Sequence, residues 1–308
     1  MRTTRSVQGC GLFLLLLVSG FSTDWVHAQN YPTKAIRIHT SAAGSGAEFA
    51  ARVVANGLAA SLGQPVVVEN HPATQVPFII KKAAPDGYTT MVVGSSSWVQ
   101  PLVEETPSYD VIRDFAPIAI LTRSPFLLVV TPSLPVKTVA DLIKLAKAKP
   151  GELNYSSALD GSTSHIAGEL FRSLSGADIV RVSYKGAAQA SSDLLSGQVH
   201  MTFGSGAGVG PQVKSGKLRA LASGGNRRSA LFPDLPTVAE TLPGFVSESL
   251  LTFWAPEKTP ETVVRRLNQE TVSALAKPET RERLLKTGQE QAGGAPELLA
   301  DAVRGEIA

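Results

Sequence analysis

The sequence predicts an α/β protein with two lobes, each of them a mainly parallel sheet flanked by helices. Short apolar runs alternate with helical patterns, which is typical of βαβ units. The alternation forms two series, one on either side of residue 125, and from Pro260 onward the pattern is purely helical. Helices without a sheet of their own must cover another surface, and the first lobe is available. The chain would then cross between the lobes twice, which is the hinge arrangement of clamshell proteins.

The first series predicts strands at 36–40, 65–69 and 88–94, with helices at 47–61 and near 77–84. The last of these strands has an apolar stretch without a charged residue, which indicates that it is largely buried. Each strand is followed by a turn or a helical pattern before the next strand begins. This order favours parallel pairing of the strands.

Two apolar runs, at 116–121 and 126–130, come next, and the segment 122–125 separates them. They lead into the second series. The helix that follows has apolar residues at helical spacing and ends before Pro150. The expected elements of the second series are a helix at 138–149, a strand at 153–157, a helix at 164–174, a strand at 179–183, a helix at 188–196, a strand at 199–203, a helix at 207–215 and a strand at 218–223. A loop and a final strand at 250–254 follow this series.

These elements predict the domain bounds. Residues 29–125 together with 249–308 are expected to form lobe 1, and residues 126–248 are expected to form lobe 2. Residues 1–28 are expected to be a signal peptide, since Arg2 and Arg5 precede an apolar core and a small residue, Ala28, closes the segment. The sequence therefore predicts a protein exported to the periplasm.

The charge and the cysteine content argue against a nucleic-acid-binding protein and against a protein stabilised by disulfides. The formal net charge is +3 with both signs scattered along the chain, so we expect no nucleic-acid partner. The single cysteine lies within the signal peptide, and the exported chain has no disulfide to form. The mature chain is long enough to be stabilised by its own core, and we expect it to be a soluble monomer.

Four small polar turns follow predicted strands at the point where helices begin. The first four N–H groups of a helix lack partners within the helix and carry the positive end of its dipole, so they attract carboxylates. Ligands bind beyond the carboxyl ends of parallel strands, where all four turns lie. Helix capping is the alternative explanation for each serine. The expected ligand-binding residues are Ser41, Ala43, Gly44, Ser45, Ser95, Ser97, Trp98, Ser162, Thr163, Ser164, His165, Gly204 and Ser205.

Catalytic and cofactor patterns are weak. Phe49 stands where a dinucleotide-binding motif needs its third glycine, and the serine turn after residue 94 does not match a nucleophile elbow. The histidines of the mature chain have no local metal-binding spacing, so we expect no metal and no cofactor. His39 and His200 are expected to be hydrogen-bonded structural residues within strands, whereas His165 could reach a carboxylate. Lys185 could bring a cation toward the cleft, although an exposed lysine at a turn is equally ordinary.

Nine segments form a specific pattern that runs from Tyr31 almost to the end of the chain. They are YPTKAIRI at 31–38, LGQPVVVEN at 62–70, APDGYT at 84–89, YDVIRDFAPI at 109–118, KAKPGELNYSSA at 147–158, HIAGELF at 165–171, YKGAAQASSDLLSGQV at 184–199, GKLRALA at 216–222 and PDLPTVAE at 233–240. With this pattern the chain resembles the solute receptors of tripartite tricarboxylate transporters, the Bug family. The resemblance implies a periplasmic binding protein with a type II-like clamshell fold. Such receptors close on a carboxylate and present it to a membrane transporter.

The resemblance also implies where the ligand is held. Receptors of this family hold one carboxylate through backbone N–H groups and waters of two turns, which correspond here to Ser41–Gly46 and Gly161–His165. The chain departs from the family pattern at the first of these turns and at 71–78, which is bulkier than the usual glycine-rich stretch. It also ends before the family's usual last helical turns, as a truncated C-terminus would.

The sequence is compatible with more than one ligand and more than one partner. The resemblance implies a C4 to C6 dicarboxylate or citrate, whereas Trp98, Phe78 or Phe253-Trp254 facing the cleft would favour an aromatic dicarboxylate such as terephthalate. Core packing is the other explanation for these rings. The protein is expected to be a receptor and not an enzyme. One alternative is a carboxylate sensor for a signalling partner, and another is an exported hydrolase with Ser97 and His165 as a dyad.

Overall fold

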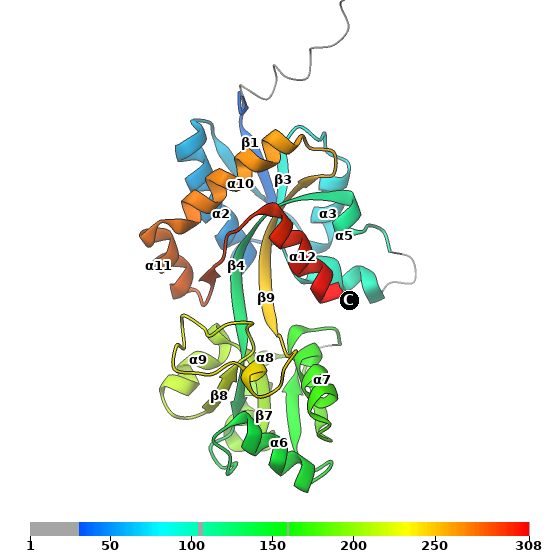
Figure 1. Ribbon diagram of the computed structural model, residues 1–308, viewed down its shortest axis with the longest axis vertical. Helices are drawn as coiled ribbons and strands as arrows, with labels where there is room; N and C mark the ends of the chain where they lie inside the picture. The colour runs from blue at the N-terminus through cyan, green and yellow to red at the C-terminus, as the bar shows by residue number, and fades with distance from the viewer. Residues whose placement is uncertain (1–30, 104–106, 159, 308) are drawn as a thin grey trace, which may run out of the picture. The chain divides into compact units, whose positions relative to one another are not determined.

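The structure is a computed structural model that describes residues 31–103, 107–158 and 160–307 (Figure 1). The expected signal peptide at 1–28 lies outside the described residues. Within the described ranges, every helix falls short of the length or the hydrophobicity that crossing a membrane requires.

The strands form one path of hydrogen-bonded neighbours in the order β2-β1-β3-β9-β4-β7-β5-β6, and β8 and β10 also pair with β4. Their bounds are β1 (Ile36–Thr40), β2 (Val66–Asn70), β3 (Thr89–Gly94), β4 (Phe115–Val130), β5 (Asn154–Ser157), β6 (Val180–Ser183), β7 (Met201–Ser205), β8 (Arg219–Ser223), β9 (Glu248–Pro256) and β10 (Glu290–Gln291). Strand β1 is parallel to β2 and β3, and β5 is parallel to β6 and β7. The expected α/β class is confirmed.

Strand β4 joins the two groups of strands. Its residues 115–125 pair antiparallel with β9, whereas 126–130 pair antiparallel with β7 and β8. The two apolar runs of the sequence belong to this one strand, because the turn-like segment 122–125 is held in the sheet by β9. Pro125 has no backbone donor, and it stands at the point where the partners of β4 change.

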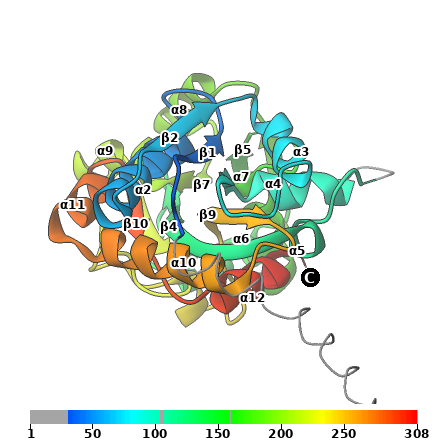
Figure 2. The same ribbon diagram turned by 90° about the horizontal axis from the view of Figure 1, so that it is seen from above.

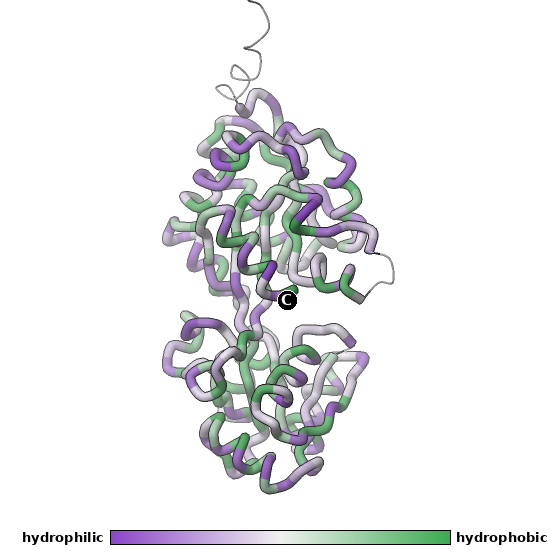
Figure 3. The backbone as a smooth tube through the Cα atoms, turned by 45° about the vertical axis from the view of Figure 1, so that its right-hand side comes forward, coloured by the Kyte–Doolittle hydropathy of each residue, from purple (hydrophilic) through white to green (hydrophobic). Residues whose placement is uncertain are grey.

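Helices cover the first group of strands and carry polar and apolar residues in alternation (Figure 3). Helix α10 packs against α2 and β4, and α12 packs against β4. The bounds are α2 (Gly46–Leu62), α3 (Val76–Lys81), α4 (Ser96–Val99), α5 (Val111–Asp114), α10 (Glu261–Ala276), α11 (Pro278–Lys286) and α12 (Pro296–Ile307), with 3-10 turns η1 (Ala73–Gln75) and η2 (Gln100–Val103).

The sequence indicated a purely helical region after Pro260, but this region also contains a short strand. Strand β10 pairs antiparallel with β4, with Glu290 opposite Arg123. A strand of two residues is too short to leave an apolar run in the sequence. Its buried Glu290 side chain accepts hydrogen bonds from the Ser229 hydroxyl, at 2.5 Å, and from the Ala230 backbone, at 3.0 Å.

The second group of strands has its own helices and core. These helices are α6 (Val139–Ala148), α7 (Thr163–Ser175), α8 (Ala187–Ser196) and α9 (Gly206–Lys214), with the 3-10 turn η3 (Val238–Glu240). The rings of Phe171, Phe203 and Phe245 contact one another at the centre of the core. Helix α7 lies over β5 because Gly168 allows a close approach: a Cβ atom there would lie 2.0 Å from the ring of Tyr155.

His200 precedes β7 and does not lie within a strand as expected. Its Nδ1 accepts a hydrogen bond from the backbone N–H of Asn154 at 3.1 Å, so the hydrogen-bonded structural role is confirmed. Burial lowers the pKa of His200 below its ordinary value of 6.5, and burial also lowers the pKa of His39. A proton on Nδ1 would remove the acceptor that Asn154 uses.

We predict that the free energy of unfolding falls as the pH drops below about 6.5, and that His200→Gln makes this fall shallower. A histidine with a lowered pKa binds protons more weakly in the folded state, so its stabilisation is complete above the ordinary pKa and is lost as the pH falls through the lowered pKa. Urea unfolding at pH 7 and pH 5 measures the effect. Equal pH dependence in the two proteins would contradict it.

Candidate functional site

Three helices begin around one pocket of about 570 Å³. Helices α7, α8 and α9 follow β5, β6 and β7, and these strands end at the same edge because β5 is parallel to both neighbours. Each helix start directs N–H groups and the positive end of a dipole outward. The pocket is therefore suited to an anion.

The lining combines hydroxyl and amide groups with a larger area of apolar surface. Among the described residues that line the pocket, Lys185 alone is charged. The hydroxyl and amide groups come from Ser156, Ser157, Ser162, Ser164, Tyr184, Ser191, Thr202, Ser205 and Gln212, and the larger apolar groups come from Phe126, Leu194, Phe203, Val209 and Leu218. The pocket thus offers an anion several hydroxyl donors and, among its described residues, one cation.

The start of α7 is held in place by its own side chains. The Ser162 hydroxyl accepts a hydrogen bond from the His165 backbone N–H at 3.3 Å, and the Ser164 hydroxyl accepts one from Ala158 at 3.0 Å. His165 Nδ1 accepts a hydrogen bond from the Gly161 N–H at 3.1 Å. The neutral imidazole then carries its proton on Nε2. Capping and ligand binding are compatible here, because the cap uses one of several N–H groups in the first turn.

The start of α9 is similar. Ser205 caps the helix by accepting a hydrogen bond from Gly208 at 3.2 Å. A Cβ atom on Gly204 would lie 2.4 Å from Val209, so a glycine is needed for this tight connection. Gly204 and Ser205 both line the pocket, as Ser162 and Ser164 do.

Arg181 was missed by the sequence analysis. From β6 it donates to the Ser157 hydroxyl at 2.7 Å, to the Ala158 carbonyl at 3.0 Å and to the Asp160 carboxylate at 2.5 Å. The hydrogen bond from Arg181 holds the pKa of Asp160 below its usual range. One guanidinium thus fixes the loop that precedes α7. An arginine among the apolar residues of a short strand was the only signal available.

Tyr184 is a second residue that the sequence analysis missed. Its hydroxyl donates to Asp193 on α8 at 2.7 Å. Burial and this hydrogen bond raise the pKa of Tyr184 to about 12. The ring is held as a wall of the pocket. Because Tyr184 is three residues before the start of α8, its contact also anchors that helix start.

The turn Ser41–Ser45 does not line this pocket, whose lining residues all lie between Phe126 and Leu218. Ser45 caps α2 by accepting from Glu48, and its hydroxyl lies 2.8 Å from that of Ser41. Ala43 and Gly44 are exposed, and Gly44 has a φ of 82°. The turn is ordered by its serines and leaves its tip in solvent.

The turn at 95–98 does not line the pocket either, and its residues form hydrogen bonds with the surrounding structure. The Ser95 hydroxyl accepts from the backbone of Leu250, and the Ser97 carbonyl accepts from Tyr109. Trp98 is buried in the core, and its indole N–H donates to Glu306 at 2.7 Å. The geometry of Trp98 is that of the core-packing alternative.

The other large aromatic side chains differ in their burial and in whether they line the pocket. Phe253 and Trp254 are fully buried, so they too pack in the core. Phe78 is exposed and packs edge to face on Tyr109. Phe126 is a ring that the sequence analysis did not single out, and it lines the pocket.

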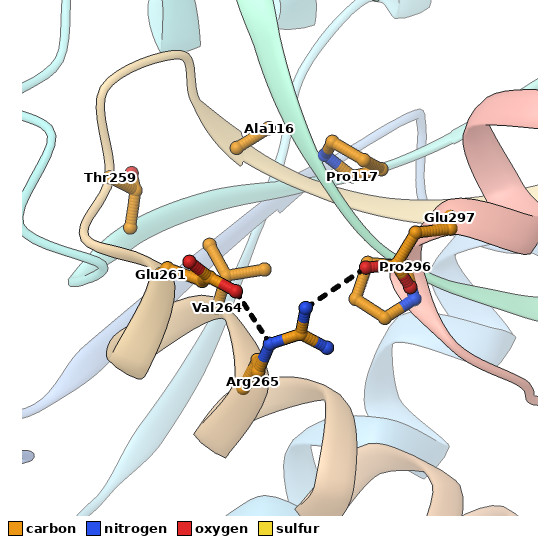
Figure 4. Close-up of a pocket in the computed structure, with 8 residues that line it drawn as sticks. All are labelled: Ala116, Pro117, Thr259, Glu261, Val264, Arg265, Pro296 and Glu297. Carbon is orange, nitrogen blue, oxygen red and sulfur yellow. Dashed lines mark hydrogen bonds and ion pairs between the residues drawn. The ribbon is translucent and has the colours of Figure 1, made fainter.

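A second pocket, of about 240 Å³, lies against the start of α10 (Figure 4). Arg265 is the one cation among the described residues of its lining, and it donates to Glu261 at 2.8 Å and to Glu297 at 3.0 Å. All three side chains are largely exposed, and such ion pairs contribute little to stability. Because two carboxylates already engage Arg265, this pocket is a poor site for another anion.

Comparisons with known proteins agree on one family. The family model described as the tripartite tricarboxylate transporter family receptor matches residues 50–300. Protein BugT of Bordetella pertussis is 34% identical over 282 residues, which are 89% of this chain and 86% of BugT.

Two solved structures are also similar. R. palustris Rpa4515 with adipate is 34% identical with a TM-score of 0.68, and the match covers 90% of this chain and 95% of that chain. MatC from Rhodopseudomonas palustris with bound malate is 29% identical with a TM-score of 0.66, covering 90% and 97%.

We predict that Gly168→Ala destabilises the protein by about 1–3 kcal/mol, because the added methyl group overlaps the Tyr155 ring and pushes α7 away from β5. Gly305→Ala is the matched control, since a Cβ atom on this helical glycine has nothing within 4 Å. Urea unfolding of both variants measures the effect, and equal stabilities would refute it.

Proposed function

The chain belongs to the family described as the tripartite tricarboxylate transporter family receptor, and on that premise we propose that it is a periplasmic receptor for a dicarboxylate. The ligand is delivered to a membrane transporter of the same type. The observation that carries the proposal is the convergence of three helix starts on one pocket with a single charged residue among its described lining.

The chemistry of the pocket supports a carboxylate. N–H groups at the starts of α7, α8 and α9 and the hydroxyls of Ser162, Ser164 and Ser205 can donate to its oxygens. Such donors bind an anion without a fixed countercharge if water is excluded. Lys185 adds one positive charge at the rim, where it favours the entry of anions.

We propose an aliphatic dicarboxylate of four to six carbons as the ligand. The proteins with adipate and with malate are similar to this chain over about nine-tenths of its length. An aromatic dicarboxylate such as terephthalate is the second candidate, because Phe126 lines the pocket and could stack on a flat ligand. The burial of Trp98 and Trp254 removes two of the rings on which that alternative first depended.

We propose that residues 29–125 with 249–308 form one lobe and that residues 126–248 form the other. The change of partners along β4 at Pro125 is the natural place for the boundary. Ligand bound at the start of α7 would then be met by the turn Ser41–Ser45 when the lobes close. A ligand that contacts both lobes shifts the population toward the closed form, which a transporter or a signalling partner can recognise.

We predict that Ser162→Ala lowers the affinity for the best-bound dicarboxylate by about 1–3 kcal/mol, because the variant removes a donor from the start of α7. Isothermal titration with malate, adipate and terephthalate identifies that ligand and measures the loss. Thr138→Ala is the matched control, since it removes a cap from α6, which does not line the pocket.

Three results would count against the proposal. Unchanged affinity in Ser162→Ala would show that the start of α7 does not hold the carboxylate. An equal loss in Thr138→Ala would assign the effect to stability. Absence of binding by all three acids would reject the dicarboxylate function.

A further inference from the structure

His39, Glu69 and His71 form a cluster, here named the His–Glu–His cluster, which the proposed carboxylate site does not use. Strands β1 and β2 lie side by side (Figure 2), and their parallel pairing sets His39 opposite Glu69. His71 comes directly after the end of β2. The two histidines are 32 positions apart in the sequence, so their spacing gives no sign of a joint site.

The distances within the cluster suit a metal ion. His39 Nδ1 and His71 Nε2 share a hydrogen bond of 3.0 Å, which an ion between them would replace, and Glu69 Oε2 lies 3.7 Å and 4.0 Å from these two nitrogens. The distances to Glu69 are too long for hydrogen bonds. The nearest point that is equidistant from the three atoms lies about 2.1 Å from each of them. This distance is within the Zn–N and Zn–O bond lengths of about 2.0–2.2 Å.

The surroundings of the cluster hold these atoms in place and leave one side accessible. Arg37 donates to Glu69 Oε1 at 3.0 Å, which orients the carboxylate with its other oxygen toward the histidines. The side chain of His39 is 8% exposed, whereas those of His71 and Glu69 are 28% and 30% exposed. The two imidazoles are stacked with their centroids 5.1 Å apart. An ion could enter from the solvent side and keep an open coordination position there.

We propose that the His–Glu–His cluster binds one divalent transition-metal ion of the Zn²⁺ class, with His39, Glu69 and His71 as its protein ligands. Two imidazoles and one carboxylate favour Zn²⁺, Cu²⁺ or Ni²⁺ over Mg²⁺ and Ca²⁺, which prefer oxygen ligands alone. A solvent molecule or a carboxylate fills the remaining position. The site is independent of the proposed dicarboxylate function.

A bound ion would also stiffen the neighbouring turn. Asn70, between two of the ligands, donates its side-chain N–H to the Ser41 carbonyl at 2.7 Å. His71 is itself tied to β1, since its backbone N–H donates to the Thr40 carbonyl at 2.9 Å. The ion would therefore link the ends of β1 and β2 just before the turn Ser41–Ser45.

The test is isothermal titration of Zn²⁺ into the purified, untagged, chelator-treated protein. We expect one ion per chain, with at least about tenfold weaker binding in His71→Gln, the loss typical of disturbing a metal site. His165→Gln is the matched control, because His165 lies at the start of α7 outside the cluster. It should bind Zn²⁺ as the unaltered protein does.

Glu69→Gln is a second variant of similar volume, which keeps the test valid if His71→Gln fails to fold. It should also weaken Zn²⁺ binding, and the melting temperature without metal reports whether each variant is folded. Replacement of Zn²⁺ by Co²⁺ should give the visible absorption of a four-coordinate site in the unaltered protein. No binding by the unaltered protein would overturn the proposal. So would folded His71→Gln and Glu69→Gln variants that bind Zn²⁺ as tightly as the unaltered protein does.

Discussion

The antiparallel pairing of β4 with β9 is the constraint on which both groups of strands depend. One end of β4 is fixed by β9, and the other end pairs with β7 and β8 behind the candidate pocket. A shift of one residue in the pairing with β9 would move the side chains of β4 to the opposite face of the sheet. The shift would also change how β4 meets β7 and β8, the strands next to the pocket. Arg123 and Glu248 form an ion pair near the point where the partners change, and both side chains are mostly buried. Loss of either partner would leave a buried charge, which secures the register.

The pocket is organised by contacts that lie outside it. Arg181 ties the loop before α7 to β6, and Asp193 holds Tyr184 at the start of α8. The caps of α7 and α9 use Ser162 and Ser205, which also face the pocket. The donors are therefore arranged before a ligand arrives, and binding needs little reorganisation of the helix starts.

Much of the fold could be predicted from the sequence, since most strands are short apolar runs followed by helical patterns. The segment 122–125 could not, because β9 overrides its turn-like composition from far along the chain. Some residues of the candidate site could likewise be predicted from the sequence, and others could not. Ser162 and Ser205 have local capping signals, whereas Arg181 and Tyr184 gain their roles from partners that only folding brings near.

None of the described residues that line the pocket is an acid or a histidine. The pKa of Tyr184, which also lines the pocket, is raised to about 12. The side chains whose charge ordinarily changes between pH 5 and 8 are histidines. The charge state of the pocket is therefore nearly constant across that range. Acidification of the surroundings would alter binding through the ligand's own ionisation, so the protein would select among the protonation states of an acid as well as among acids.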